Sequence, residues 1–189
     1  MTNAAIVPGS LGAVAKKTGQ SIAQGFLNVK CLVMVDTSGS MNDADAGDGL
    51  TRHEAARLQL ERLQAENPGE VGVCSFSSSA EFCPGGVPNV RNSSTNMAAA
   101  LKMMKMADGC GIRLVLISDG CPDDSVAALD LAKTFTSKID TIYVGNEGDY
   151  GRKFLRQLSD ATGGISITNA AAELSKLSDN ITKLIGAGA

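Results

Sequence analysis

A series of short apolar runs recurs along the chain, and helix-like segments separate them. The runs are nearly continuous rather than alternating between apolar and polar residues, which is typical of strands that are covered on both faces. The runs occupy residues 30–35, 70–76, 113–118, 139–144 and 164–168, and the helical segments occupy residues 51–66, 95–107, 123–136, 151–162 and 170–185. Strands that alternate with helices predict a doubly wound α/β fold, with a mainly parallel, Rossmann-like sheet and helices on both faces.

Two further segments complete the predicted organisation. The run SAEF at 79–82 follows the second strand after a serine turn, and it predicts an antiparallel strand at the edge of the sheet. Residues 1–29 carry apolar side chains at helical spacing but are interrupted by glycines, including Gly12. We therefore expect an N-terminal arm that packs on a domain formed by residues 30–189, which is long enough to bury its own core.

Charge and cysteine content exclude several classes of protein. The formal net charge is −3, with 17 Lys and Arg against 20 Asp and Glu, and no basic run is long enough to favour nucleic acid. The sequence contains neither a signal-peptide pattern at its start nor an apolar stretch of membrane-spanning length. The five cysteines form no C-x-x-C pair and are expected to be free thiols in a reducing compartment. These features predict a cytoplasmic protein without nucleic acid or membrane partners.

The first predicted strand ends abruptly in the polar sequence DTSGS. Asp36, Ser38 and Ser40 alternate along this stretch, and a tight turn containing Gly39 would bring their oxygens toward one point. Asp119 follows a later buried strand in the same way. In doubly wound sheets, ligands bind outside the carboxyl ends of the strands, where the strand order reverses. Because carboxylate and hydroxyl oxygens suit a hard divalent cation, the pattern predicts a metal site there.

Three motifs in this order resemble the von Willebrand factor A (VWA) domain and its metal-ion-dependent adhesion site (MIDAS). They are DTSGSM after one apolar strand, STNMAAAL in the middle of the chain and LISDG after a later strand, and the likeness covers about residues 30 to 185. The family pattern is Asp-x-Ser-x-Ser, then a Thr, then an Asp. The resemblance implies a VWA fold and a bound Mg²⁺ or Mn²⁺ whose ligands are Asp36, Ser38, Ser40, Thr95 and Asp119.

The resemblance also implies a function. Family members typically recognise a partner protein whose Asp or Glu carboxylate completes the coordination of the metal, and this role is not enzymatic. Stand-alone intracellular members of the bacterial or phage type often work beside an ATPase or an assembly complex. One departure concerns the second motif, where Ser93 and Ser94 stand in place of frequent glycines, so that either serine is an alternative ligand to Thr95. Thr95 is preferred because it directly precedes the predicted helix.

Other interpretations of the same residues remain open. In a metal-dependent phosphoryl hydrolase, Asp36 would be the nucleophile and Asp119 would hold Mg²⁺, but Ser38 stands where that chemistry places a second aspartate. In a structural subunit the site would be vestigial and residues 1–29 would mediate assembly. DTSGS alone is also compatible with a polar turn that caps a helix.

Two neighbouring features are interpreted as non-catalytic. The acidic segment 42–52 fails the pattern of a calcium-binding EF-hand loop, and we expect a solvated, flexible loop that contributes to partner specificity together with residues 83–94. His53 is the only histidine and is expected at the surface of the first helix turn. A single histidine in that place argues against a Ser-His-Asp or Cys-His mechanism.

Overall fold

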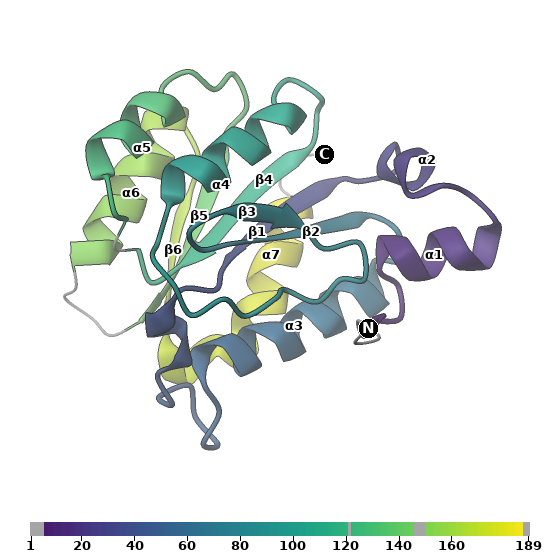
Figure 1. The fold of residues 1–189 in the computed structure, drawn as a ribbon, viewed down its shortest axis with the longest axis horizontal. Coiled ribbons are helices and arrows are strands. Elements are labelled where there is room, and N and C mark those ends of the chain that lie inside the picture. The colour runs from purple at the N-terminus through teal and green to yellow at the C-terminus, as the bar shows by residue number, and fades with distance from the viewer. Residues whose placement is uncertain (1–5, 121, 146–149, 187–189) are drawn as a thin grey trace.

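The computed structural model describes residues 6–120, 122–145 and 150–186, and a six-stranded sheet forms its centre (Figure 1). The strand order is β3-β2-β1-β4-β5-β6; β3 is antiparallel to β2, and the other neighbouring strands are parallel. The strands are β1 (Cys31–Asp36), β2 (Val71–Phe76), β3 (Ala80–Phe82), β4 (Arg113–Ser118), β5 (Ile139–Gly145) and β6 (Ser166–Ala170). The predicted doubly wound sheet with one antiparallel edge strand is therefore confirmed.

The central strands are apolar along their whole length because both faces of the sheet are covered. Every residue of β1, β2 and β5 is buried. Successive side chains of β1 point to opposite faces, so that Val33 belongs to one core and Met34 to the other. β1 lies between β2 and β4, and the strand order reverses there. The carboxyl ends of β1 and β4 thus flank the place where a ligand is expected.

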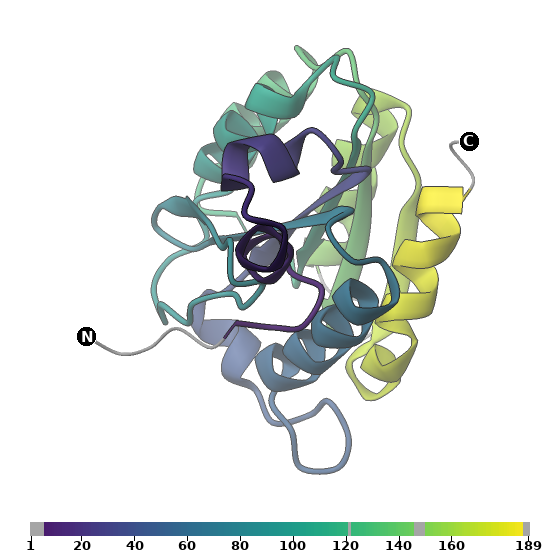
Figure 2. The ribbon, with the colours of Figure 1, turned by 90° about the vertical axis from the view of Figure 1, so that its right-hand side faces the viewer.

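Helices cover the sheet in two layers (Figures 1 and 2). On one face, α3 and α7 bury Leu60, Leu63 and Ile181 against the sheet. On the other face, α4, α5 and α6 bury side chains such as Leu101 and Phe154. These helices are α3 (Arg52–Glu66), α4 (Met97–Met104), α5 (Ser125–Ala132), α6 (Tyr150–Thr162) and α7 (Leu177–Gly186). Within the described ranges, no helix is both long enough and apolar enough to cross a membrane.

Several predicted boundaries are corrected by capping side chains. The helix predicted to start at residue 95 begins at Met97, because the Asn96 side chain accepts a hydrogen bond from the Ala99 N–H at 3.0 Å. The helix predicted from residue 123 likewise begins after Asp124, which accepts from the Ala127 N–H at 2.9 Å. Short 3₁₀ segments replace parts of other predicted helices: η2 (Lys105–Ala107) follows α4, and η3 (Ala171–Lys176) precedes α7.

The N-terminal arm contains two short helices, α1 (Leu11–Thr18) and α2 (Ile22–Phe26). The backbone N–H of Gly12 donates to the Pro84 carbonyl at 2.7 Å, and a side chain at Gly12 would meet that oxygen at 2.8 Å. Gly12 is therefore not the helix break that its identity predicts, since it lies inside α1 and permits a close approach to the domain. Residues 1–5 of the predicted arm lie outside the described residues.

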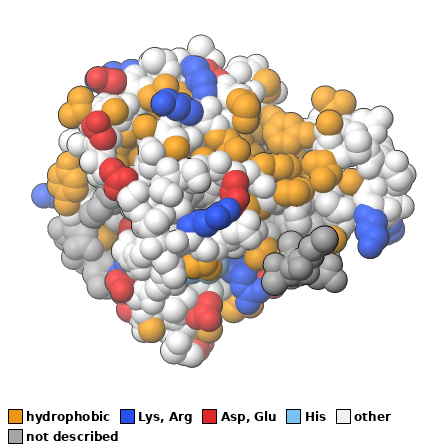
Figure 3. Space-filling model, viewed as in Figure 1, with side chains coloured by type: hydrophobic (Ala, Val, Ile, Leu, Met, Phe, Trp, Pro, Cys, Tyr) orange, Lys and Arg blue, Asp and Glu red, His pale blue; other side chains and the backbone are white. Residues whose placement is uncertain are grey.

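The arm meets the domain through apolar side chains as well. The Phe26 and Phe82 rings lie 6.1 Å apart in an edge-to-face arrangement. Together with Met103, these rings line a depression between the arm and the domain, and Figure 3 shows hydrophobic side chains gathered there. The arm thus adds to the β2–β3 side of the molecule and leaves the carboxyl ends of β1 and β4 uncovered.

Candidate metal site

The five residues of the expected metal site lie at the carboxyl ends of the central strands. Asp36 is the last residue of β1, and Asp119 directly follows β4. Thr95 precedes the residue that caps α4. Asp36, Ser38, Thr95 and Asp119 are buried, whereas Ser40 is exposed in the short 3₁₀ segment η1 (Gly39–Asn42). Segments far apart in the sequence therefore contribute oxygen atoms to one end of the sheet.

The DTSGS stretch forms a turn stabilised by its own side chains. Asp36 Oδ1 accepts a hydrogen bond from the Ser38 N–H at 2.8 Å, and the Ser38 and Ser40 hydroxyl oxygens lie 3.3 Å apart. The intervening Thr37 hydroxyl points elsewhere and donates to the Phe76 carbonyl at 2.9 Å. Gly39 has no positive φ, and a side chain there would meet nothing within 4 Å. The turn therefore does not need the conformational freedom of glycine that the sequence predicts at Gly39. The space where a side chain of residue 39 would lie is open.

Asp36 is oriented by a residue that sequence reasoning missed. The Ser118 hydroxyl donates to Asp36 Oδ2 at 2.5 Å and accepts from the Gly120 N–H at 2.8 Å. Burial and, less strongly, the charge of nearby Asp119 raise the pKa of Asp36 to about 6 despite this hydrogen bond. A bound cation would relieve both effects.

Asp119 has an incomplete set of partners. Its Oδ2 accepts from Arg52 Nη1 at 3.3 Å, whereas its Oδ1 is buried and has no hydrogen-bond partner among the described residues. Burial raises the pKa of Asp119, and the nearby Ser40 hydroxyl and Arg52 guanidinium lower it only in part. A buried carboxylate oxygen without a partner is costly, and such a group calls for an explanation such as an ion.

Thr95 is held in place through its backbone. Its N–H donates to Asp123 Oδ1 at 3.1 Å, and its carbonyl accepts from the Asp123 N–H at 3.0 Å. Of the two alternatives to Thr95, Ser93 directs its hydroxyl to the Ser78 hydroxyl at 3.2 Å, and Ser94 is exposed. The geometry therefore favours Thr95, and Asp123 is a second supporting residue that no sequence signal identified.

These residues fit a hard divalent cation. They supply two carboxylates and three hydroxyls, and one of the carboxylate oxygens is buried with no partner in the described part of the chain. In the part of the chain that the structure describes, no three or more His, Cys, Asp and Glu side chains form a metal-binding group. The candidate site thus depends on hydroxyl oxygens to complete the coordination.

The segment predicted as a free acidic loop is tied to this site. Arg52, the first residue of α3, is 6% exposed and forms a fork with Asp45, at 2.8 Å from Nε to Oδ1 and 2.7 Å from Nη2 to Oδ2. His53 is also buried, at 6% exposed, contrary to the prediction of a surface residue, and burial lowers its pKa. The α3 N-terminus therefore lies inside the fold beside the candidate site.

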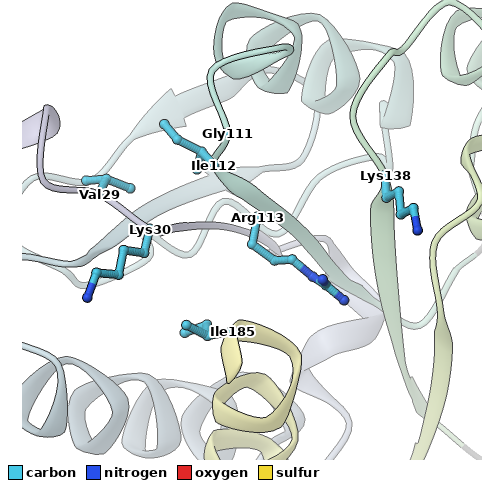
Figure 4. Close-up of a pocket in the computed structure, with 7 residues that line it drawn as sticks. All are labelled: Val29, Lys30, Gly111, Ile112, Arg113, Lys138 and Ile185. Carbon is cyan, nitrogen blue, oxygen red and sulfur yellow. The ribbon is translucent and has the colours of Figure 1, made fainter. Parts of the chain in front are cut away.

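The opposite end of the sheet carries basic side chains. Lys30, Arg113 and Lys138 surround a depression with apolar walls at the amino ends of the strands (Figure 4). Lys30 pairs with Glu70 at 2.7 Å, and Arg113 pairs with Asp140 at 2.5 Å. The three basic side chains make this depression an unfavourable place for a divalent cation.

The chain is similar to known proteins in its fold. No protein-family model matches the chain, and no curated protein matches it. Solved structures do match: the fold is similar to that of a von Willebrand factor type A protein from Catenulispora acidiphila, with a TM-score of 0.63 and 16% identity over 85% of this chain and 43% of that chain.

Two further structures are similar. The vWF domain of the type V pili tip protein Mfa5 from Porphyromonas gingivalis has a TM-score of 0.63 and 14% identity, over 85% of this chain and 95% of that chain. The manganese-loaded TRAP protein of Plasmodium vivax has a TM-score of 0.54 and 14% identity, over 84% of this chain and 74% of that chain. At these identities the likeness establishes the fold alone: the chain has the fold of von Willebrand factor type A domains.

Proposed function

We propose that this chain is a non-enzymatic protein-binding module that uses Mg²⁺ or Mn²⁺ to engage an Asp or Glu carboxylate of a partner protein. The metal ligands would be Asp36, Ser38, Ser40, Thr95 and Asp119. The observation that carries the proposal is the buried Oδ1 of Asp119, which has no hydrogen-bond partner among the described residues and lies near the Ser38–Ser40 hydroxyl pair.

Each group has a distinct part in this function. A divalent cation would supply an electrophilic centre that accepts one more anionic oxygen from outside. The neutral hydroxyls add ligands without adding negative charge. Ser118 fixes the orientation of Asp36, and Asp123 fixes the segment that carries Thr95. The open space at Gly39 gives a partner side chain access to the site.

The similar structures support this role by analogy. One is loaded with manganese, and another is the vWF domain of a pilus tip protein. The hydrolase alternative is weaker, because Ser38 replaces the second aspartate of that chemistry and its N–H instead donates to Asp36. A cytoplasmic location and an ATPase or assembly complex as the partner remain predictions from the resemblance.

Calorimetric titration of Mg²⁺ and Mn²⁺ into the metal-stripped chain tests the metal. We expect saturable binding at one site that is lost in Ser38→Ala and in Asp119→Asn. Ser94→Ala is the matched control, because Ser94 is exposed next to Thr95 and is not needed as a ligand. Binding that is equal in all four proteins would refute the assigned ligands.

Water-proton relaxation of the Mn²⁺-loaded protein tests the open coordination position. A small dicarboxylate such as glutarate should displace metal-bound water and lower the relaxation enhancement, whereas a neutral diol of similar size should not. Metal binding without any response to the dicarboxylate would refute the proposed mode of partner recognition and would support only a metal-binding role.

A further inference from the structure

Arg52 is a buried cation surrounded by carboxylates at the edge of the candidate metal site. Its guanidinium forms the fork with Asp45, donates to Asp119 at 3.3 Å and lies 3.6 Å from Asp43. A backbone hydrogen bond also joins Arg52 to this group of acids, since the Arg52 N–H donates to the Asp43 carbonyl at 3.1 Å. α3 packs against η1, so the helix that begins with Arg52 contacts the segment that carries Ser40.

The position of this arginine is not explained by the helix that carries it. The first turn of a helix favours negative side chains, because the backbone N–H groups there have a partial positive charge. A buried cation at the first residue of α3 is therefore unfavourable for the helix, and it is stabilised by the three aspartates. Two of these belong to the loop before α3, and the third is a candidate ligand of the metal.

We propose that Arg52 sets the affinity of the site for its divalent cation, because it competes with the metal for the Asp119 carboxylate. Asp45 has the opposing role: it is the acceptor that draws Arg52 away from Asp119. This inference rests on the proposed metal-binding function and adds to it two residues, Arg52 and Asp45, that no resemblance assigns.

The distances show the balance between the two acceptors. Both contacts of Arg52 with Asp45 are shorter, at 2.8 and 2.7 Å, than its single contact with Asp119 at 3.3 Å. Arg52 is therefore held mainly by Asp45, and its contact with Asp119 is the one that a metal can replace. A guanidinium charge within a few ångströms of a dication lowers the affinity roughly tenfold or more, even with strong solvent screening.

Substitution of Arg52 and of Asp45 should change the metal affinity in opposite directions. Arg52→Gln removes the competing charge and should tighten Mn²⁺ binding about tenfold, as measured by calorimetry on the metal-stripped full chain. Arg52→Lys keeps the charge but loses the fork, and it should not tighten binding. Asp45→Asn frees Arg52 for Asp119 and should weaken binding several-fold.

Asp48→Asn is the matched control for Asp45→Asn. Asp48 lies in the same loop, is exposed and has a φ of 51°, which asparagine tolerates. It reports the effect of removing one loop charge without releasing Arg52. If Arg52→Gln fails to fold, the comparison between Asp45→Asn and Asp48→Asn still decides, because only the first should weaken binding strongly.

The outcomes separate this inference from the function on which it rests. Tighter binding in Arg52→Gln, including binding that the native chain lacks, supports the competition. Equal or weaker binding in Arg52→Gln, while the native chain binds Mn²⁺ saturably, overturns it and leaves Arg52 as a structural clamp with the metal site intact. An equal effect of Asp45→Asn and Asp48→Asn also overturns it. If neither the native chain nor Arg52→Gln binds metal, the proposed function fails and the inference fails with it.

Discussion

Two buried aspartates lie beside arginines at opposite ends of the sheet, but only Asp140, at the amino end, has both oxygens bonded. Its Oδ2 accepts from Arg113 Nε at 2.5 Å, and its Oδ1 accepts from the Ile165 N–H at 2.8 Å. Asp119, at the carboxyl end, has a longer contact with Arg52 at 3.3 Å and a second oxygen without a partner among the described residues. Both side chains are less than 10% exposed.

The difference separates a structural ion pair from the candidate metal site. A buried carboxylate whose two oxygens are both hydrogen-bonded has no capacity for a further ligand, and loss of either partner of its ion pair leaves an uncompensated charge. A buried carboxylate with one oxygen that accepts no hydrogen bond can still bind a cation through that oxygen. The surroundings agree, because Lys30 and Lys138 add positive charge near Arg113, whereas Asp43 and Asp45 add negative charge near Arg52.

The largest expected effect is a difference in protein stability between variants of the two aspartates. Asp140→Ala should lower the free energy of unfolding by roughly 3–5 kcal/mol, because it leaves the partly buried Arg113 without its partner. Asp119→Ala in the metal-free protein should change the free energy of unfolding by about 1 kcal/mol at most, because Arg52 keeps its fork with Asp45. Urea denaturation of the two metal-stripped variants measures both values. Similar losses in the two variants would show that Asp119 is structural as well.

The next effect is a pH dependence that is specific to the carboxyl end. The pKa of Asp36 is raised from 3.8 to about 6 by burial. Between these values the folded protein holds a proton on Asp36 that the unfolded chain has released, so that the contribution of Asp36 to the free energy of unfolding of the metal-free protein should fall as the pH rises. The expected fall is about 3 kcal/mol in total.

Chemical denaturation at a series of pH values between 4 and 6.5 measures this dependence. Asp36→Asn is the control, since it cannot ionise, and its unfolding free energy should vary less over the same range. Saturating Mn²⁺ should also oppose the fall, because the cation binds the ionised carboxylate. Equal pH dependence of the unfolding free energy in the native chain and in Asp36→Asn would contradict the expected role of Asp36 burial.

The fold was predictable from local patterns. Continuous apolar runs identified the buried strands, and the helix predicted over residues 51–66 begins at a Thr51–Glu54 capping box, in which Glu54 accepts from the Thr51 N–H at 2.9 Å. Errors occurred where capping side chains decided the boundary, as at Asn96 and Asp124. Hydrophobic periodicity does not reveal such caps, because it indicates which face of a helix is apolar and not at which residue the helix begins.

The site was predictable only in part, because its supporting residues have no distinctive sequence context. Ser118 is one more residue of a buried strand, and Arg52 ends an acidic segment whose composition predicts a solvated loop. Their roles depend on contacts with residues far away in the chain, 82 positions for the Ser118–Asp36 pair and 67 for Arg52–Asp119. A cation at the first helix residue was the one available signal for Arg52, because a helix does not favour it there.

The smallest expected effect compares two glycines that pack tightly at the two ends. A side chain at Gly151, in the first turn of α6, would meet the Asp119 carbonyl at 2.0 Å, and one at Gly164 would meet the Ile139 carbonyl at the same distance. Gly151→Ala and Gly164→Ala should each lower the free energy of unfolding by about 1–3 kcal/mol, because the neighbouring backbone must shift. Only Gly151→Ala should also weaken Mn²⁺ binding, by several-fold, because the shift displaces Asp119. Denaturation and calorimetry on both variants measure the two quantities, and a loss of metal affinity in Gly164→Ala as well would mean that the two ends of the sheet are not independent.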